Sequence, residues 1–188
     1  MKKIKILSLL FCVVMLVAAC HDDEEGPIIP QPREQVGRTV LVYIVGDNGV
    51  NELSDLFKTN FEDMKEGMKE VDYSKCNLVV YSEMVNDVPR LVSLKKQNGK
   101  VVADTLFTYS EQNPLAKEVM SSVISQTVSY FPADSYGFVF LSHSSSWVPA
   151  TNDANSRSIG YYRRTQMNIP DFHDVLLSSF PRPLKFIL

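Results

Sequence analysis

The chain has 188 residues, of which 45% are hydrophobic and 22% charged, a composition typical of one folded domain that argues against long-range disorder. Its formal net charge is −3. Three of its 19 basic residues lie in an N-terminal segment that we expect to be removed, which leaves 16 basic residues against 22 acidic ones and a charge of −6. No basic patch or arginine-rich run is visible, so the sequence predicts no nucleic-acid partner.

Residues 1–20 have the features of a secretion signal. Three lysines within the first five residues precede the apolar stretch 6–17, which is too short to span a membrane comfortably. The sequence Leu-Val-Ala-Ala-Cys that ends at Cys20 resembles a bacterial lipobox, in which the cysteine becomes the lipidated N-terminus. We therefore expect residues 1–20 to be a lipoprotein signal peptide; a generic signal peptide or a plain membrane anchor is the alternative.

Residues 21–37 are expected to form an acidic and proline-rich tether. The run 21–25, His-Asp-Asp-Glu-Glu, resembles the tag that sends Bacteroidetes lipoproteins to the outer face of the outer membrane, and a plain solvated linker is the alternative. Residues 26–32 contain three prolines and favour a stiff, extended backbone. The expected location is therefore the cell envelope, with the lipid in the outer membrane and the domain exposed at the surface.

The three cysteines have different expected roles. Cys12 lies in the signal and Cys20 is the expected lipid site, so Cys76 alone remains in the folded domain. One thiol cannot form an internal disulfide, and neither a disulfide framework nor a cysteine-based metal site is expected.

The pattern beyond the tether begins with a strand and a helix. Residues 38–45 are a β-branched run that predicts a strand, and a loop signal at 46–49 ends it. Asn51 or Ser54 is a candidate cap for the helix that follows. That helix is predicted by apolar residues spaced by threes and fours, which are Leu53, Leu56, Phe57, Phe61, Met64, Met68 and Val71.

The middle of the chain predicts a second strand, a hairpin and a second helix. Residues 76–81 form the strand, and Asn98-Gly99, between residues 90–97 and 100–108, predicts a two-residue hairpin turn because both residue types tolerate positive φ. Asn113-Pro114 predicts the cap and first position of a helix that extends to Phe131.

The last part of the chain predicts two more strands and a short helix. Residues 136–141 are the third strand, 151–165 a polar loop, 170–180 a helix and 184–188 the start of a fourth strand. This order predicts a three-layer α/β/α sandwich with a mostly parallel sheet and an inserted β-hairpin.

The most informative candidate for chemistry is His143, which follows the third strand. Ligands gather outside the carboxyl ends of parallel strands, and an imidazole placed there can act as a general acid or base near neutral pH. The alternative is a histidine that bonds only to nearby backbone. Spacing alone does not separate the two.

Other polar residues are weaker candidates. Asp47 and Asn48 could orient a substrate or bind a cation, although a turn pair is the simpler interpretation. Glu83 and Asp153 could join a calcium site, but no ordered ligand spacing supports one. Trp147 could line a cleft or pack within its loop.

Serine and cysteine could each supply a nucleophile for His143, and both are disfavoured. Ser144 and the two serines after it lack a G-x-S-x-G elbow, and a serine adjacent in sequence rarely points at the histidine ring. Cys76 begins the second strand whereas His143 ends the third, which puts them roughly 20 Å apart at about 3.3 Å per residue. Cys76 is predicted to be a small buried residue.

Three segments resemble the clostripain family of cysteine peptidases. Residues 39–48, Thr-Val-Leu-Val-Tyr-Ile-Val-Gly-Asp-Asn, resemble its opening strand and Asp-Asn turn. Residues 136–149 resemble its strand ending in S-H-G-x-G-W, and residues 157–160 with 167–172 resemble the segment that leads to its fourth strand. Together these segments span most of residues 38–188.

The resemblance implies a caspase-like fold and a histidine–cysteine dyad whose histidine matches His143. The family's cysteine lies in a D-A-C motif that would directly follow Leu188, so this chain lacks it, along with the aspartate that favours arginine or lysine at the cleaved bond. The resemblance also places Trp147 at the substrate cleft and allows a dependence on calcium. Ser144 stands where the family has a glycine whose N–H helps bind the oxyanion.

We therefore expect residues 38–188 to be the N-terminal part of a clostripain-like peptidase domain, truncated before the catalytic cysteine and inactive alone. The complete protein would hydrolyse peptide or protein substrates after arginine or lysine. The alternative is a non-catalytic surface lipoprotein that uses the same fold to bind peptide or glycan.

Overall fold

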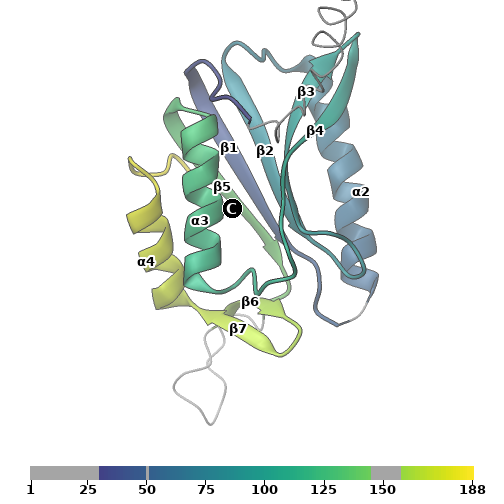
Figure 1. Ribbon diagram of the computed structural model, residues 1–188, viewed down its shortest axis with the longest axis vertical. Helices are drawn as coiled ribbons and strands as arrows, with labels where there is room; N and C mark the ends of the chain where they lie inside the picture. Colours follow the sequence, from purple (N-terminus) through teal and green to yellow (C-terminus); the bar gives the residue numbers. More distant parts are fainter. Residues whose placement is uncertain (1–29, 50, 145–157) are drawn as a thin grey trace, which may run out of the picture. The chain divides into compact units, whose positions relative to one another are not determined.

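The computed structural model describes residues 30–49, 51–144 and 158–188. Residues 31–188 belong to one compact unit built on a five-stranded sheet with the strand order β4-β3-β2-β1-β5 (Figure 1). The strands are β1 (Val36–Val45), β2 (Cys76–Glu83), β3 (Arg90–Gln97), β4 (Lys100–Thr108) and β5 (Ala133–Ser142).

The strand β1 lies at the centre of the parallel part of the sheet because both of its faces are apolar. It pairs in parallel with β2 on one side and with β5 on the other. Leu41, Tyr43 and Val45 pack into one core and Val42 and Ile44 into another, which is the two-residue alternation of a strand covered on both faces. The prediction of a mostly parallel sheet is confirmed.

The predicted hairpin is confirmed, and it widens the main sheet. The strands β3 and β4 pair antiparallel, and β3 pairs antiparallel with β2. Asn98 and Gly99 have φ angles of 50° and 77°, the positive values that a two-residue turn of this type requires.

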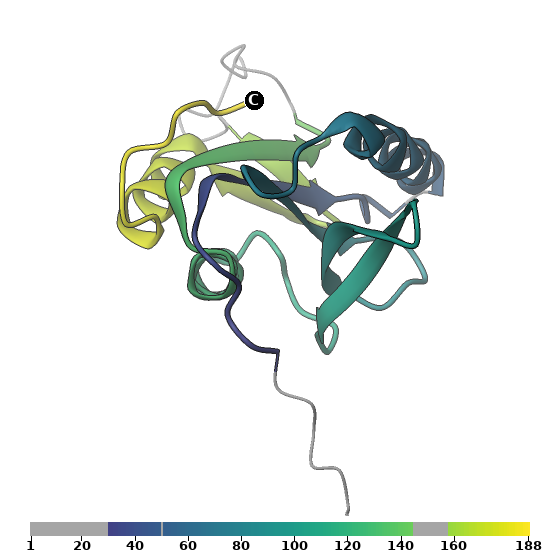
Figure 2. The same ribbon diagram turned by 90° about the horizontal axis from the view of Figure 1, so that it is seen from above.

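Helices cover both faces of the sheet, as the α/β/α prediction requires. The helix α2 (Asn51–Gly67), extended by a 3₁₀ turn (Met68–Glu70), packs on one face. The helices α3 (Lys117–Tyr130) and α4 (Ile169–Ser179) pack into the core of the other face. Figure 2 shows α2 and α3 on opposite sides of the sheet.

Three details of the predicted helices are wrong. Leu56 of α2 is 54% exposed, and Ser54 is no cap, since its hydroxyl donates to the Gly46 carbonyl and accepts from the Val85 N–H. The helix α3 begins at Lys117, not at residues 113–114. The Asn113 side chain instead accepts a bond from the N–H of Leu115 in a turn that precedes the helix.

The polar loop predicted for residues 151–165 is wrong over residues 158–165. These residues form β6 (Ser158–Tyr162) and the start of β7 (Thr165–Asn168), an antiparallel hairpin that is a separate two-stranded sheet. Residues 151–157 lie outside the described part of the chain. Gly160 allows the hairpin to approach the core closely, because a Cβ there would lie 2.9 Å from side-chain atoms of both Leu115 and Phe140.

The segment predicted as a fourth strand lies beside β5 and runs parallel to it. It makes one bridge, between Ile187 and Phe138, and alternating backbone hydrogen bonds of 2.8–3.1 Å join residues 185–188 to residues 136–140. A side chain at Gly137 would overlap the ring of Phe186, so glycine permits this close approach. The last residues therefore take the predicted place in the sheet, although only as a short ladder.

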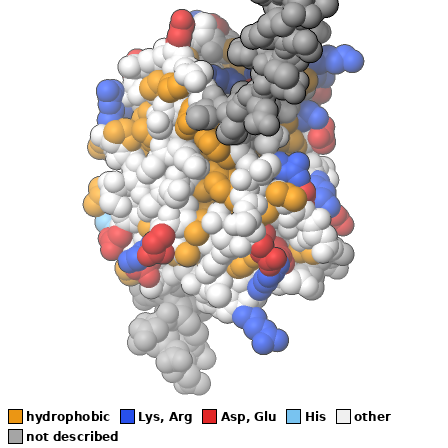
Figure 3. Space-filling model, in the orientation of Figure 1, with side chains coloured by type: hydrophobic (Ala, Val, Ile, Leu, Met, Phe, Trp, Pro, Cys, Tyr) orange, Lys and Arg blue, Asp and Glu red, His pale blue; other side chains and the backbone are white. Residues whose placement is uncertain are grey.

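The surface carries mixed charge. On the face that Figure 3 shows, acidic and basic side chains lie next to one another rather than in separate patches. Within the described part of the chain, no helix is both long enough and apolar enough to cross a membrane.

Candidate functional site

His143 directly follows β5, at the carboxyl end of the parallel strands. Its side chain is exposed, and its ring meets the ring of Tyr161 edge-on, with the two ring centres 5.5 Å apart and the planes at 61°. Tyr161 belongs to β6, so the β6–β7 hairpin forms one wall beside the imidazole. An exposed imidazole in this position is free to exchange a proton with a bound molecule.

The end of β5 is joined to the hairpin by the side chain of Ser142. Its hydroxyl accepts a hydrogen bond from the Tyr161 N–H at 3.2 Å and lies 3.5 Å from the Tyr161 carbonyl, to which it can donate. At this point the Ser142 side chain, rather than its backbone, makes the hydrogen bonds that join β5 to β6. Tyr161 is therefore held next to His143 by its backbone.

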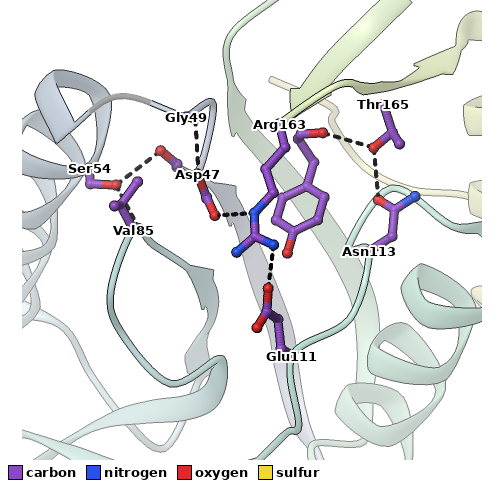
Figure 4. A network of polar contacts seen from close by, with 10 residues as sticks. Asp47, Gly49, Ser54, Val85, Glu111, Asn113, Arg163 and Thr165 are labelled. Atoms are coloured by element: carbon purple, nitrogen blue, oxygen red, sulfur yellow. Dashed lines mark hydrogen bonds and ion pairs between the residues drawn. The ribbon is translucent and has the colours of Figure 1, made fainter.

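The turn of the hairpin is fixed to the end of β1 by Arg163. Figure 4 shows the guanidinium of Arg163 between the carboxylates of Asp47 and Glu111. Its Nε donates to Asp47 Oδ2 at 2.8 Å, its Nη1 pairs with Glu111, and its backbone N–H donates to the Asp47 carbonyl at 2.9 Å. The hydrogen bonds to the two carboxylates raise the pKa of Arg163 above its ordinary value.

The turn after β1 is held by short polar contacts from the opposite side. Asp47 Oδ1 accepts the Gly49 N–H at 3.1 Å, and the Gly46 N–H donates to the Glu83 carbonyl at 2.7 Å. The Ser54 hydroxyl bridges Gly46 and Val85. The ends of β1 and β2 are thus joined to the first turns of α2, which fixes the Asp47 carboxylate toward Arg163.

Glu83, the last residue of β2, is a buried acid next to this network. Its side chain is only 2% exposed, and its Oε2 has no hydrogen-bond partner in the described part of the chain. Burial, helped by the nearby charge of Asp47 and partly offset by Arg163, raises the pKa of Glu83 from its ordinary 4.5 to about 7. Both the neutral and the charged form of the carboxyl are therefore populated near neutral pH.

The placement of Cys76 excludes it as a partner of His143. Arg38 of β1 is level with both Cys76 and Ser135, and His143 lies eight residues beyond Ser135, or roughly 26 Å at about 3.3 Å per residue. Cys76 is half-buried rather than fully buried as predicted, and its Sγ lies 3.9 Å from the Asp72 carbonyl. Burial raises the pKa of its thiol, the opposite of what a reactive cysteine needs.

The other predicted site residues are spread unevenly around His143. Ser144 is exposed and adjacent, and Asn48 lies in the turn after Asp47, where its N–H donates to the Gly46 carbonyl at 3.2 Å. Trp147 and Cys20 lie outside the described residues. The structure therefore brings Asp47, Asn48, His143 and Ser144 to one end of the sheet.

The described residues at this end of the sheet include no group of acidic side chains suited to a calcium ion. Within residues 30–49, 51–144 and 158–188, no three histidine, cysteine or acidic side chains are grouped so as to hold a metal. The Asp47 carboxylate is occupied by Arg163 and Gly49, and Asp153 lies outside the described residues. No step of the chemistry is therefore assigned to a metal.

Sequence reasoning missed Tyr161 and Arg163, the two residues that build the hairpin wall. The signal was the short run of residues 159–162, Ile-Gly-Tyr-Tyr, in which three of four residue types favour strands, followed by two arginines. A run of four residues is too short to separate a strand from a loop.

A sequence model of the clostripain family matches residues 42–187, which include the end of β1, all of β5 and His143. The chain belongs to the clostripain family. No curated protein is similar enough to count as a match.

Solved structures agree with the clostripain assignment. A secreted C11 cysteine protease from Bacteroides thetaiotaomicron, bound to an irreversible peptide inhibitor, is 39% identical over 81% of this chain and 41% of its own, with a TM-score of 0.66. A B. fragilis cysteine protease is 42% identical over 62% of this chain and 97% of its own, with a TM-score of 0.55.

A third clostripain relative is an inactive zymogen C11 protease from Parabacteroides distasonis. It is 34% identical over 63% of this chain and 34% of its own, with a TM-score of 0.56. The present chain thus spans less than half the length of this protein and of the B. thetaiotaomicron protease. The predicted caspase-like α/β/α fold and the predicted family are both confirmed.

Proposed function

We propose that this chain is the histidine-bearing part of a clostripain-type cysteine endopeptidase, with His143 as the group that takes the proton of a cysteine thiol. The observation that carries the proposal is the exposed imidazole directly after β5, in a chain of the clostripain family. The thiolate would attack a peptide carbonyl, and the protonated imidazole would then give its proton to the leaving amine. A preference for arginine or lysine before the cleaved bond follows from the family resemblance.

The nucleophile of the proposed reaction is not among these 188 residues, since no cysteine follows His143. The direction of residues 185–188 supports a position for this nucleophile near His143. Residues 185–188 run parallel to β5, and the Phe140 N–H donates to the Leu188 carbonyl at 2.8 Å. In a longer protein, residues after Leu188 would continue toward the same end of the sheet as His143, where the resemblance expects a D-A-C motif.

Hydrolysis of fluorogenic peptides with arginine or lysine before the cleaved bond tests this function. The 188-residue chain should be inactive, and the same chain extended by its downstream coding sequence should hydrolyse the peptides and be labelled by an irreversible peptide inhibitor. In the extended protein, His143→Ala should lower kcat/KM at least about 100-fold because general-base catalysis is lost.

His173→Ala is the matched control, because His173 is an exposed histidine that belongs to α4 and not to the end of β5. Its kcat/KM should stay at the wild-type value. Full activity of His143→Ala, or a stop codon directly after Leu188, would contradict the peptidase proposal and favour a protein that only binds peptide or glycan.

We also propose that the domain is carried on the outer surface of the outer membrane by a lipid on Cys20. The lipobox-like residues and the acidic tag support this location. Cells fed a labelled fatty acid should incorporate it into the wild-type protein, and Cys20→Ser should abolish the label and move the protein to the aqueous phase of a detergent partition. Cys76→Ser should behave as wild type, and a labelled Cys20→Ser protein would exclude this anchor.

A further inference from the structure

The β6–β7 hairpin contacts the end of β5 through one aromatic residue. The rings of Tyr161 and His143 meet edge-on, and the Tyr161 N–H donates a hydrogen bond to the Ser142 hydroxyl. His143 is otherwise exposed, so this aromatic neighbour is the contact that restricts its ring among the described residues.

The same hairpin is anchored by Arg163, two residues after Tyr161. The residue has a φ of 52°, as the turn between Tyr162 and Thr165 requires, and its guanidinium lies 5.1 Å from the centre of the Tyr162 ring. It binds Asp47 and Glu111, which belong to segments far apart in the sequence (Figure 4). The Asp47 side chain is 7% exposed and that of Arg163 is 49% exposed. Loss of Arg163 would therefore leave the buried charge of Asp47 without its ion-pair partner.

Side-chain and backbone contacts hold the hairpin on either side of Tyr161 and Arg163. Gly160 brings β6 into close contact with Phe140 and Leu115, and the Thr165 hydroxyl donates to the Tyr162 carbonyl at 2.9 Å and lies 3.3 Å from Asn113 Oδ1. A movement of Arg163 would therefore reach Tyr161 through a single intervening residue, Tyr162, which is packed in the core.

We propose that Arg163 and Tyr161 are positioning residues for His143: Arg163 anchors the hairpin on Asp47 and Glu111, and Tyr161 limits the orientations of the imidazole. The catalytic consequence rests on the proposed peptidase function, but the structural relationship does not. Orientation matters because a proton acceptor displaced by about 1 Å can lose as much as about 100-fold in rate.

Nuclear magnetic resonance of the full 188-residue chain tests the relationship without any peptide hydrolysis. The wild-type chain should show Overhauser contacts between the ring protons of Tyr161 and His143, with His143→Gln assigning the histidine signal. Tyr161→Ala should shift the His143 ring signals toward those of a freely rotating histidine. Tyr161→Phe should keep both the ring contact and the signal positions.

Arg163→Ala should weaken the Tyr161–His143 contact although neither ring has been changed, and Arg163→Lys should restore it in part. The matched control is Arg164→Ala, an exposed neighbour on the same turn, which should leave the His143 signals in place. The His173 signal reports on the fold in every variant. If Arg163→Ala fails to fold, the comparison of Tyr161→Phe with Tyr161→Ala still decides the outcome.

Unchanged His143 signals in Tyr161→Ala, or equal changes in Arg164→Ala and Arg163→Ala, would overturn the proposal. In the extended, hydrolysing protein, Tyr161→Ala should lower kcat about 10- to 100-fold with little change in KM. Loss of the Overhauser contact and absence of hydrolysis are separate results, so a failure of the positioning role is distinguishable from a failure of the peptidase function.

Discussion

Replacement of Glu83 by glutamine should raise the free energy of unfolding at pH 8 by up to about 3 kcal/mol and leave it nearly unchanged at pH 4.5. The cause is the burial of this carboxyl, which raises its pKa from the ordinary 4.5 to about 7, with the charge of Asp47 adding to the effect. Glutamine keeps the shape of the side chain but carries no charge to desolvate.

The direction of the pH dependence follows from the raised pKa of Glu83. At and below pH 4.5 the carboxyl is largely protonated in the folded chain, so its contribution to stability is present. Between pH 4.5 and 7 the unfolded chain releases the proton first, and the folded state loses stability as the pH rises. Above pH 7 the loss is complete, and the difference between wild type and Glu83→Gln reaches its maximum.

Urea unfolding of both proteins at pH 4.5, 6, 7 and 8 measures this difference. Glu62→Gln is the control, since Glu62 is an acid whose side chain is 67% exposed and which pairs with Lys65 on α2. Its difference from wild type should stay small at every pH. Equal stabilities of Glu83→Gln and wild type across the whole range would contradict the burial of the Glu83 carboxyl.

Phe138→Ala should lower the free energy of unfolding by about 4 kcal/mol, the typical cost of removing a fully buried aromatic ring. The Phe138 side chain is 0% exposed at the middle of β5. Its ring lies between 5.9 and 6.4 Å from four aromatic rings of β1, β5, α4 and the end of α4, which are Tyr43, Phe140, Phe172 and Phe180. Removal of the ring would therefore leave a cavity between the sheet and the helix layer.

Chemical unfolding at one pH measures this loss, and Leu177→Ala is the control. Leu177 is on the same helix layer but is 71% exposed, so its truncation should change stability by less than about 0.5 kcal/mol. A loss below about 1 kcal/mol in Phe138→Ala would mean that the core collapses around the missing ring, and that the packing between β5 and α4 is not a unique arrangement.

The central strands could be predicted because their physical signal is local. The apolar runs of β1, β2 and β5 are covered on both faces, and each stands between turn-forming residues. The β3–β4 hairpin could be predicted equally well, since Asn98 and Gly99 tolerate the positive φ that the turn needs. The position of His143 followed from the end of the β5 run.

The start of α3 was mispredicted because two structures share the same short signal. Asn113 followed by Pro114 suits both a helix cap and a turn in which the asparagine side chain accepts a hydrogen bond from the backbone N–H two residues later. The structure has the second, with the bond to Leu115, and the helix begins only at Lys117. Local sequence does not distinguish these two arrangements.

The hairpin of β6 and β7, and the network it completes, could not be predicted from local patterns. Its strands are short and largely polar, and burial of Tyr162 and Met167 against the main core is what stabilises them. The bond from Arg163 to Asp47 joins residues 116 positions apart. Neither the residue types nor their spacing predicts such a pairing. The β6–β7 hairpin beside His143 is therefore defined only by the tertiary structure.

The parallel pairing of β1 with β5 has a consequence for the order of assembly. Val36 pairs with Ala133, whereas Gln97 pairs with Lys100. The β3–β4 hairpin closes a short loop and can form as soon as it leaves the ribosome, but the pairing of β1 with β5 requires nearly a hundred further residues to be synthesised after β1 begins. The edge that carries His143 is thus among the last parts of the domain to form, and an immature chain has no organised imidazole site.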